Sequence, residues 1–387
     1  MPPNQGDDLG AALEALLAEQ MPSALRRQSQ VEMTPAEYMR QRRMYIANKM
    51  AGQTRIYLDT NFWIRIRDVQ LDRSSSNADQ RLSELMFKGR QEERLVAPAS
   101  DITITEILRQ RDPQTRHMSA ETIDQLSMGL AVRSFYDRCA IEIENWVGDP
   151  SPEGGGSPRS DPRVWTSPIH VLAEDTYAPP HGFPRWVQEK ALRTLMDALS
   201  RIDFTRAVEA LSNIPLELDQ PGTLAATLNE VETPDPALDF DQVFRDECAG
   251  YWKAIWSKFL DPRSTRPGLI EGSSIRPFDS QTKTAAADSA LSALDHGTLG
   301  CHLPTMQVAS GGYAAIRVQR DRRFKKGDTG DLHHASGALG YCDAFFTERS
   351  LSHLLTTPPL SRALSDFTCS IHHETDDVIA YLESLVG

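Results

Sequence analysis

Cysteine is scarce in this sequence, and its cysteines lack the spacings that would give them a structural role. Five cysteines occur among 387 residues, at widely separated positions and with no CxxC pair. This pattern excludes a disulfide framework and a zinc knuckle, and it favours a reducing compartment. No apolar run approaches the length of a membrane span, and the opening stretch carries acids where a signal peptide needs positive charge. We therefore expect a soluble cytoplasmic protein with no membrane partner.

An excess of positive charge is also missing. The formal net charge is −13, which argues against attachment to nucleic acid or membranes through the overall field but leaves local basic patches open. The 23 glycines and 24 prolines are average usage, which excludes a globally disordered or fibrous chain. A hydrophobic fraction of 40% is enough for a core, and 387 residues can form one large domain with an insertion or two to three small domains.

The most informative local pattern is a short strand that ends on an acid. Residues 55–58, RIYL, are mostly apolar and directly precede Asp59. An amphipathic helix then starts at Asn77, with Gln80 closing a capping box, and the strand LVAP from Leu95 leads into another helix. Strands that alternate with helices at this spacing predict right-handed crossovers and a parallel sheet, so we expect an α/β fold.

Changes in composition divide the chain into parts. Residues Thr34, Pro35 and Glu37 mark a helix start near the N-terminus. A long helical pattern covers 119–147, and the segment 148–163 is typical of an exposed flexible linker because it is rich in glycine and proline. We predict a helical extension, the first half of an α/β core, a linker with a helical insertion, and the second half of the core, over 1–53, 54–147, 148–300 and 301–387.

Acidic residues are predicted to gather at one edge of the sheet. In an open parallel sheet, ligands bind outside the carboxyl ends of the strands, where Asp59 lies and where Glu106 follows in the first turn of a helix. A helix of about ten residues from Asp331 descends ~15 Å and the strand DAFFT climbs back ~17 Å. The chain therefore returns to the same edge at Glu348. Asp343 begins that strand, so we expect it at the far end with a structural hydrogen bond, although another register would make it the fourth acid.

Each acid has a structural explanation when taken alone. Glu106 and Thr103 fit a capping box, and Asp328 and Asp331 suit the start of a helix. The convergence of separate segments favours a metal site instead, because carboxylates at close range raise one another's pKa unless a cation is present. Oxygen ligands suit Mg²⁺ or Mn²⁺, which lower the pKa of bound water and neutralise charge on a phosphate. The pattern thus indicates metal-assisted hydrolysis of phosphodiesters.

These residues resemble the PIN-domain nucleases. That family has an Asp at the end of its first strand, often as DTN, a Glu in the helix after the second strand, an Asp that opens a later helix, and a fourth acid after a strand ending in Thr or Ser. The matching positions are Asp59 with Thr60 and Asn61, Glu106 in TITEIL, Asp331 in GDLHHA, and Thr347 with Glu348 in FFTER. An acid at the position of Asp328 recurs in similar PIN-like proteins of bacterial origin. Two features depart from the pattern, which are a Glu as the fourth acid and the large insertion.

The resemblance implies a three-layer fold around a mostly parallel sheet. It also implies an endonuclease that cleaves single-stranded RNA, in preference to the alternative of a deoxyribonuclease, and leaves 5′-phosphate and 3′-hydroxyl ends. It implies that four residues are catalytic and hold Mg²⁺ or Mn²⁺ directly or through water: Asp59, Glu106, Asp331 and Glu348. Five residues are implied in supporting positions, with Asn61 and Thr347 holding the carboxylate rotamers: Thr60, Asn61, Asp328, Asp343 and Thr347.

A basic loop precedes the third acid. It contains six cations and one acid, Asp321, in an otherwise acidic protein. A basic loop beside a carboxylate cluster is the expected electrostatic footprint of a nucleic-acid site, although a solvated surface loop explains it equally simply. We predict that these residues contact nucleic acid: Arg317, Arg320, Arg322, Arg323, Lys325 and Lys326.

Competing interpretations stay open. The chain could be a catalytically inactive PIN-like binding or regulatory module that recruits a protein partner through the N-terminal helices or the insertion. An aspartyl-phosphate phosphatase is disfavoured because Asn61 stands where that chemistry needs an acid. His333 and His334 lie near Asp331, but a histidine on a helix is more often hydrogen-bonded than a metal ligand. The sequence does not decide between RNA and DNA as the substrate. It also leaves open the cleavage specificity, the metal stoichiometry, the role of the insertion, the oligomeric state and the pathway.

Overall fold

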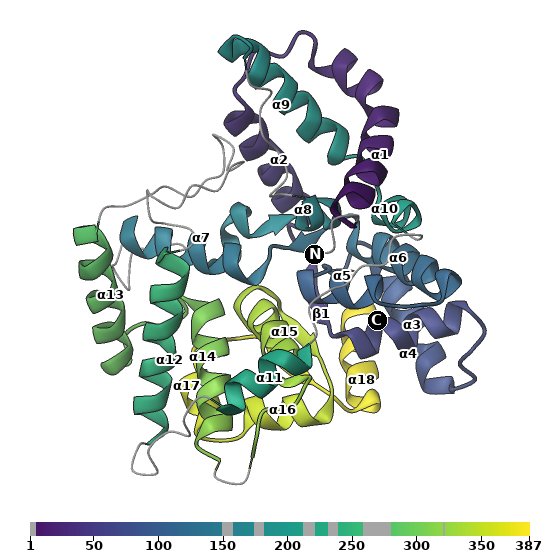
Figure 1. Cartoon of the computed structure of the whole chain (residues 1–387). Helices are drawn as coiled ribbons and strands as arrows, with labels where there is room; N and C mark the ends of the chain where they lie inside the picture. Colours follow the sequence, from purple (N-terminus) through teal and green to yellow (C-terminus); the bar gives the residue numbers. More distant parts are fainter. Residues whose placement is uncertain are drawn as a thin grey trace.

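A small parallel sheet organises the structure, a computed structural model that describes residues 5–148, 158–173, 182–211, 221–230, 239–257, 280–319 and 322–387. Helices dominate the described chain (Figure 1). The sheet has the strand order β2-β1-β5-β6, and every neighbouring pair is parallel. Its strands are β1 (Thr54–Leu58), β2 (Leu95–Val96), β5 (Ala344–Phe346) and β6 (Ser370–His372). The expected parallel sheet is confirmed, and its two central strands come from distant parts of the chain.

The central strands are apolar over Ile56–Leu58 of β1 and throughout β5, because both faces of the sheet are covered there. Tyr57 lies beside Phe345 in register, and both belong to one buried hydrophobic cluster. Ile56 and Leu58 point to the opposite face, where they join a second cluster with Phe346. The alternation of side chains along a strand thus divides the core into two layers, one on each side of the sheet.

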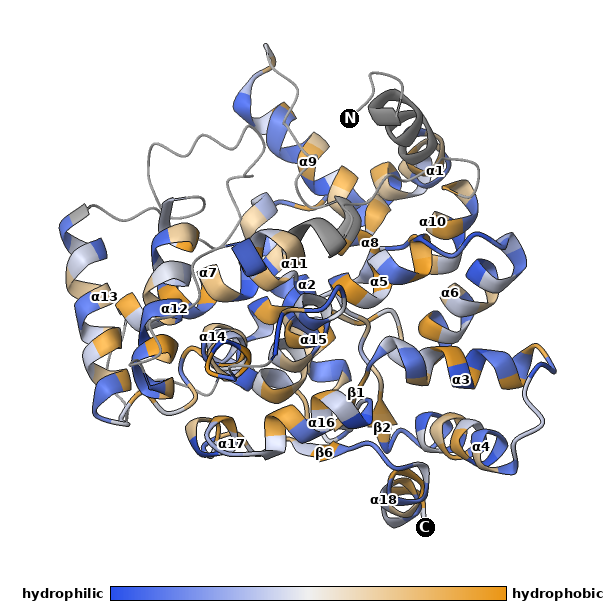
Figure 2. Ribbon diagram, turned by 60° about the horizontal axis from the view of Figure 1, so that its bottom comes forward, coloured by the Kyte–Doolittle hydropathy of each residue, from blue (hydrophilic) through white to orange (hydrophobic). Residues whose placement is uncertain are grey.

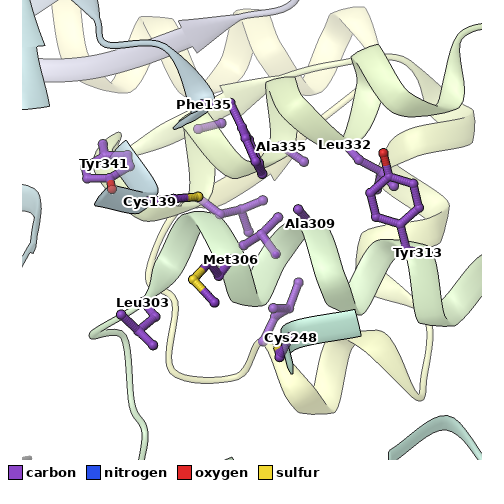
Figure 3. Close-up of a cluster of buried hydrophobic side chains, with 14 of the residues drawn as sticks. Phe135, Cys139, Cys248, Leu303, Met306, Ala309, Tyr313, Leu332, Ala335 and Tyr341 are labelled. Carbon is purple, nitrogen blue, oxygen red and sulfur yellow. The ribbon is translucent and has the colours of Figure 1, made fainter. Parts of the chain in front are cut away.

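Helices form the outer layers. The cluster that contains Ile56 and Leu58 is covered by α3 (Thr60–Gln70), α4 (Asn77–Gln91), α5 (Asp101–Leu108), α6 (Pro113–Ser127) and α18 (Thr375–Val386). The cluster that contains Tyr57 is built with α7 (Phe135–Gly148), α12 (Phe240–Ile255), α14 (Pro304–Arg317), α15 (Asp328–Tyr341), α16 (Arg349–Thr356) and α17 (Leu360–Ala363). Figure 3 shows its centre, where Met306 and Ala309 of α14 lie among Cys139, Cys248 and Ala335. Helix α12 of the predicted insertion therefore shares one core with α14 and α15.

The N-terminal helices pack on another group of helices from the middle of the chain. Helices α1 (Gln5–Gln28) and α2 (Pro35–Lys49) lie against α9 (Arg185–Leu199) at the top of Figure 1, with α8 (Pro168–Ala173) and α10 (Phe204–Ala210) below. Asp197 on α9 accepts hydrogen bonds from Arg27 and Tyr38, at 2.8 Å each. The remaining helices are α11 (Pro221–Glu230) and α13 (Ser280–Asp295). Figure 2 shows alternating polar and apolar residues along the helices, as expected for helices that bury one side. In the described chain, no helix is both long and apolar enough to cross a membrane.

The single long helix predicted over 119–147 is wrong. Helix α6 ends at Ser127, and Met128 and Gly129 follow with positive φ angles of 59° and 71°. Such angles end a helix because an L side chain rarely adopts them, and glycine adopts them freely. The chain then forms β3 (Ala131–Val132), which pairs antiparallel with β4 (Trp165–Thr166), before α7 begins.

The flexible linker predicted over 148–163 is wrong in its described part; its residues 149–157 lie outside the described residues. Two short 3-10 helices, η1 (Pro158–Ser160) and η2 (Pro162–Val164), follow, and ion pairs hold them to the core. Arg163 pairs with Glu144 at 2.6 Å and with Asp161 at 2.8 Å, while Arg159 donates a hydrogen bond to Thr368 at 2.8 Å. Composition cannot reveal the contacts with Glu144 and Thr368, because those partners lie outside the segment.

The helix starts are confirmed in one case and shifted in another. Thr34 and Glu37 form the predicted reciprocal capping box of α2. The predicted box of Asn77 and Gln80 is wrong, because Ser76 caps α4 by accepting a hydrogen bond from the backbone N–H of Asp79. Serine and asparagine are equally good caps, so the sequence alone cannot choose between adjacent positions.

Candidate functional site

Asp59 lies where β1 ends and α3 begins. Its backbone N–H bonds to the Phe346 carbonyl at 3.0 Å, which ties it to the end of β5. Its carboxylate caps α3, because Oδ1 accepts hydrogen bonds from the backbone N–H groups of Asn61 at 2.9 Å and Phe62 at 3.4 Å. Asn61 thus holds Asp59 through its backbone, and not through its exposed side chain as predicted. Burial raises the pKa of Asp59, and His334 and Thr347 oppose this shift.

Glu106 lies in the second turn of α5, not in the first. The capping box predicted for Thr103 and Glu106 is wrong, because Ser100 caps α5 through the Thr103 N–H. The Oε2 atom of Glu106 instead accepts a hydrogen bond from the Thr60 hydroxyl, on α3. Burial raises the pKa of Glu106, but His334 and Thr60 outweigh it and leave the pKa below its usual value. Glu106 therefore faces the start of α3 next to Asp59 and has no capping role.

Asp331 lies in the first turn of α15, which begins at Asp328 and not at Asp331 as expected. Among the described residues, nothing donates a hydrogen bond to its side chain. Burial, together with the charges of Glu348, Asp328 and Asp59, raises the pKa of Asp331 to about 7, while the charge of His334 opposes this shift. A Cβ atom placed on Gly330 would lie 4.0 Å from Oε1 of Glu106, so the start of α15 closely approaches α5.

Asp328 is a structural acid at this helix start. Its carboxylate accepts a hydrogen bond from the backbone N–H of Lys325 at 2.8 Å and pairs with Arg322 at 3.1 Å. The side chain is 6% exposed. Asp328 therefore closes the turn before α15 and helps to position the first turn of this helix, which carries Asp331.

Thr347 and Glu348 follow β5 at the same sheet edge. Glu348 precedes α16, is exposed, and accepts a hydrogen bond from the Ser350 hydroxyl at 2.6 Å. Thr347 is fully buried. Its hydroxyl has no hydrogen-bond partner within 3.5 Å among the described residues, yet it lies near enough to Asp59 to lower the pKa of that carboxyl. Thr347 and Glu348 thus join the cluster from the carboxyl end of β5.

Asp343 directly precedes β5, so it lies at the amino-terminal ends of the strands, opposite the acidic cluster, as expected. Its carboxylate accepts a hydrogen bond from the backbone N–H of Arg55 at 2.8 Å and pairs with Arg159 at 2.5 Å. Arg55 is near the start of β1, four residues before Asp59. The strand register therefore makes Glu348, and not Asp343, the fourth acid of the cluster.

His334 is the residue that sequence reasoning undervalued. Its side chain is 4% exposed, its Nδ1 atom lies 2.9 Å from the Tyr57 hydroxyl, and its Nε2 atom lies 3.7 Å from Oε2 of Glu106. The charges of Glu106, Asp59 and Asp331 all act on it. His333 turns the other way and stacks on Phe135 at 4.2 Å between ring centroids. The available signal was the one-turn spacing from Asp331 to His334, which puts both on one side of a helix.

The basic loop is only partly free to meet a ligand. Arg317 pairs with Glu247 at 2.5 Å, and Arg322 pairs with Asp328. Arg323, Lys325 and Lys326 are exposed, whereas Arg320 lies outside the described residues. The backbone of Phe324 is held by Asn229 of α11 through hydrogen bonds of 2.9 and 3.0 Å. The loop therefore presents three cations immediately before the helix that carries Asp331.

The carboxylates and His334 form an electrostatic cluster at the carboxyl ends of β1 and β5. Within the described part of the chain, no three His, Cys, Asp or Glu side chains are already arranged as the ligands of a metal ion. Asp331 nevertheless lacks a hydrogen-bond donor among the described residues, and burial together with its acidic neighbours raises its pKa. Comparison of the chain with protein-family models, with curated proteins and with solved structures finds no match. The resemblance to PIN-domain nucleases thus stays a prediction from residues and spacing.

Proposed function

We propose that this protein is a metal-dependent endonuclease that cleaves single-stranded RNA. The observation that carries the proposal is the convergence of Asp59, Glu106 and Asp331 on His334, with Glu348 acting on Asp331. These acids come from separate segments of the chain. Mutual repulsion makes the cluster costly for folding, which is typical of a site kept for binding a cation.

The residues divide into donors and positioning groups. Asp59, Glu106, Asp331 and Glu348 would hold Mg²⁺ or Mn²⁺, which when bound lowers the pKa of a water and neutralises phosphate charge. The Thr60 hydroxyl fixes one oxygen of Glu106, and the backbone N–H of Asn61 fixes one oxygen of Asp59. Each of these two carboxylates therefore keeps its second oxygen free to face a ligand.

The choice of substrate rests on charge and on the resemblance. A net charge of −13 would repel a polyanion, so a nucleic acid needs a local attraction. Arg323, Lys325 and Lys326 supply one beside the start of α15. Single-stranded RNA is the substrate implied by the resemblance to PIN-domain nucleases, and the chemistry of the cluster itself fits either nucleic acid.

The test is a cleavage assay on the full chain with 5′-labelled single-stranded RNA and DNA, in Mn²⁺, in Mg²⁺ and in EDTA. The informative variant is Asp59→Asn, because asparagine keeps the carbonyl that caps α3 but loses the charge. The matched control is Asp343→Asn, an acid on the same sheet at the opposite edge. We expect metal-dependent cutting of RNA, a loss of about 100-fold or more in Asp59→Asn, and a change below about threefold in the control.

The products and the negative outcome are equally informative. Ends that carry a 5′-phosphate and a 3′-hydroxyl support hydrolysis by an activated water. If folded wild-type protein cuts neither polymer in either metal, the nuclease proposal is wrong. An inactive module that acts through a protein partner would then be the better interpretation.

A further inference from the structure

A second cavity lies beside the sheet, away from the acidic cluster at the carboxyl ends of β1 and β5. It has a volume of about 130 Å³ and lies between the C-terminal half of α2 and the loops that precede β3 and α10. Val96 of β2 lines it, in register with Arg55 near the start of β1. Asp59 is four residues further along, or about 13 Å. A cavity of roughly 150 Å³ can hold a benzene-sized group, so this one has room for a phosphate group.

Arg42 and Lys49 of α2 line this cavity with their charged ends held in place. Nη2 of Arg42 donates a hydrogen bond to the Ser200 carbonyl at 2.9 Å, and Nζ of Lys49 donates one to the Met128 carbonyl at 3.1 Å. A carbonyl is a neutral acceptor, so these bonds position the two side chains without balancing their charge. The Nε atom of Arg42 is buried and has no hydrogen-bond partner among the described residues. Both side chains therefore keep donors for an anion.

The helix itself offers no acid to balance these charges. From Tyr38 to Lys49 the sequence has four cations and no acid. Neither Arg42 nor Lys49 forms an ion pair with another residue that the structure describes. Burial and the charges of Arg90 and Arg42 lower the pKa of Lys49, which shows how closely like charges approach here. An anion bound between them would relieve this repulsion.

Two acids also line the cavity, and one of them is fully engaged. Asp124 accepts hydrogen bonds from the backbone N–H of Phe204 at 3.1 Å and from the backbone N–H and hydroxyl of Thr205 at 2.7 and 2.6 Å. It therefore fixes the start of α10. Asp203 is exposed, and its side chain does not cap α10. Of the described lining residues, Asp203 is thus the acid that would oppose an anion.

An exposed aromatic ring stands beside the two cations. Tyr45 lines the cavity, yet it is 58% exposed. The guanidinium of Arg42 lies over this ring, 5.6 Å from its centroid. Aromatic rings beside cations are the surfaces on which proteins stack single nucleobases, and arginine strengthens such a stack. The cavity and Tyr45 thus offer places for a phosphate and for a base next to each other.

We propose that this cavity binds a nucleoside phosphate, with the phosphate between Arg42 and Lys49 and the base stacked on Tyr45. The inference does not rest on the proposed function, because these residues belong neither to the acidic cluster nor to the basic loop. A free nucleotide and the phosphorylated end of a nucleic acid present the same chemistry to the cavity. The volume of the cavity leaves the base outside, where both ligands can reach Tyr45.

Titration calorimetry on the full chain, in EDTA, tests the proposal with AMP, adenosine and inorganic phosphate. EDTA removes divalent cations, so the acidic cluster holds no metal to attract phosphate. The informative variant is Lys49→Gln, because glutamine can still donate to the Met128 carbonyl but carries no charge. The matched control is Arg40→Gln, which removes an exposed cation of the same helix that does not line the cavity. Circular dichroism checks that each variant is folded.

We expect AMP to bind the wild type and Arg40→Gln equally, and Lys49→Gln about tenfold more weakly. Adenosine should bind more weakly than AMP, because it lacks the phosphate. Tyr45→Leu should weaken AMP binding about fivefold or more and change phosphate binding less than about twofold. Asp203→Asn should strengthen the binding of both, because it removes a repelling charge.

Competition with a 5′-phosphorylated oligonucleotide identifies the source of the ligand. Displacement of AMP supports the end of a nucleic acid, and a lack of displacement supports a free nucleotide. A folded wild type that binds neither AMP nor phosphate overturns the inference, as does an AMP affinity unchanged in Lys49→Gln or in Tyr45→Leu. AMP binding that disappears when Arg323, Lys325 and Lys326 are replaced by alanine would place the site in the basic loop and also overturn it.

Discussion

The hydroxyl of Tyr341 donates a hydrogen bond to the carboxylate of Glu142, 199 residues earlier in the sequence. Both side chains are almost completely buried. The same carboxylate accepts hydrogen bonds from the backbone N–H of Thr305 at 3.0 and 3.2 Å. Burial raises the pKa of Glu142 to about 7 even with these donors present. Glu142 therefore joins α7 to the start of α14 and the end of α15.

Tyr341→Phe should destabilise the fold by about 1–3 kcal/mol, because it leaves the buried carboxylate with one donor fewer and also removes the hydrogen bond between the Tyr341 and Thr305 hydroxyls. Urea unfolding at neutral pH measures this change. Metal binding at the other end of α15 should be unaltered, since the Tyr341 side chain lies at the helix end opposite Asp331. Tyr45→Phe is the control, as Tyr45 is 58% exposed. Equal stability of Tyr341→Phe and wild type would contradict the prediction.

Asp343 should prove structural. Replacement by alanine removes the acceptor for the Arg55 backbone N–H and the ion pairs with Arg55 and Arg159. We expect a loss of about 1–2 kcal/mol of unfolding free energy, since the pairs are partly exposed and contribute little beyond the backbone hydrogen bond. Titration with Mn²⁺ should show wild-type affinity. A weakened Mn²⁺ affinity in a folded Asp343→Ala protein would instead place this acid in the metal site.

The parts of the site that could be predicted follow from the local geometry of strands. RIYLD predicts a strand that ends on Asp59, and a helix followed by a strand returns the chain to the same edge at Glu348. These inferences need only rise per residue and the parallel direction of the strands, which the sheet confirms. The far placement of Asp343 follows from the same reasoning.

The remaining features depend on contacts between distant segments. The rotation of α15 about its axis decides that His334, and not His333, faces the acids, and this rotation is set by packing on α14 and β1. The bond from Thr60 to Glu106 replaces the capping box that the local sequence favoured. Glu247 and Asp328 neutralise two cations of the basic loop, and neither pairing has a local signal that separates it from a solvated charge.

Asp331 gives a test by pH in the absence of metal. Burial raises its pKa to about 7 in the folded chain, whereas an unfolded aspartate has a pKa of about 4. The folded state therefore binds more protons than the unfolded state between about pH 4 and pH 7, so stability falls as the pH rises through this window. Asp331→Asn removes this penalty. We expect it to match wild type at pH 4 and to be more stable by about 1–3 kcal/mol at pH 8.

Urea unfolding in EDTA at several pH values provides the comparison. Asp376→Asn is the control, because Asp376 is an exposed acid on α18, and its profile should follow wild type throughout. A constant difference between Asp331→Asn and wild type across the pH range would show that Asp331 titrates as an ordinary surface acid. The crowding of carboxylates around His334 would then be looser than the structure indicates.

Close helix packing behind the site gives a further prediction. A Cβ atom on Gly312 of α14 would clash with the buried side chain of Leu332, which follows Asp331 on α15. Gly312→Ala should therefore cost about 1–3 kcal/mol of stability through overpacking, despite the better helix propensity of alanine. Gly250→Ala on α12 is the control, because a Cβ atom there meets nothing within 4 Å. Thermal and urea unfolding of both variants measure the difference, and a Gly312→Ala protein as stable as the control would refute the close approach.

The three exposed cations of the basic loop should carry the electrostatic part of RNA binding. Replacing Arg323, Lys325 and Lys326 by alanine should weaken binding and lower the slope of log K against log salt by about 2, because each phosphate contact to a single strand contributes roughly 0.7. Fluorescence anisotropy with labelled single-stranded RNA in EDTA measures binding without cleavage. Arg317→Gln should leave the slope unchanged, because Arg317 is held by Glu247 and offers no free charge. A triple variant with the wild-type slope would move the nucleic-acid surface away from this loop, whatever the metal centre does.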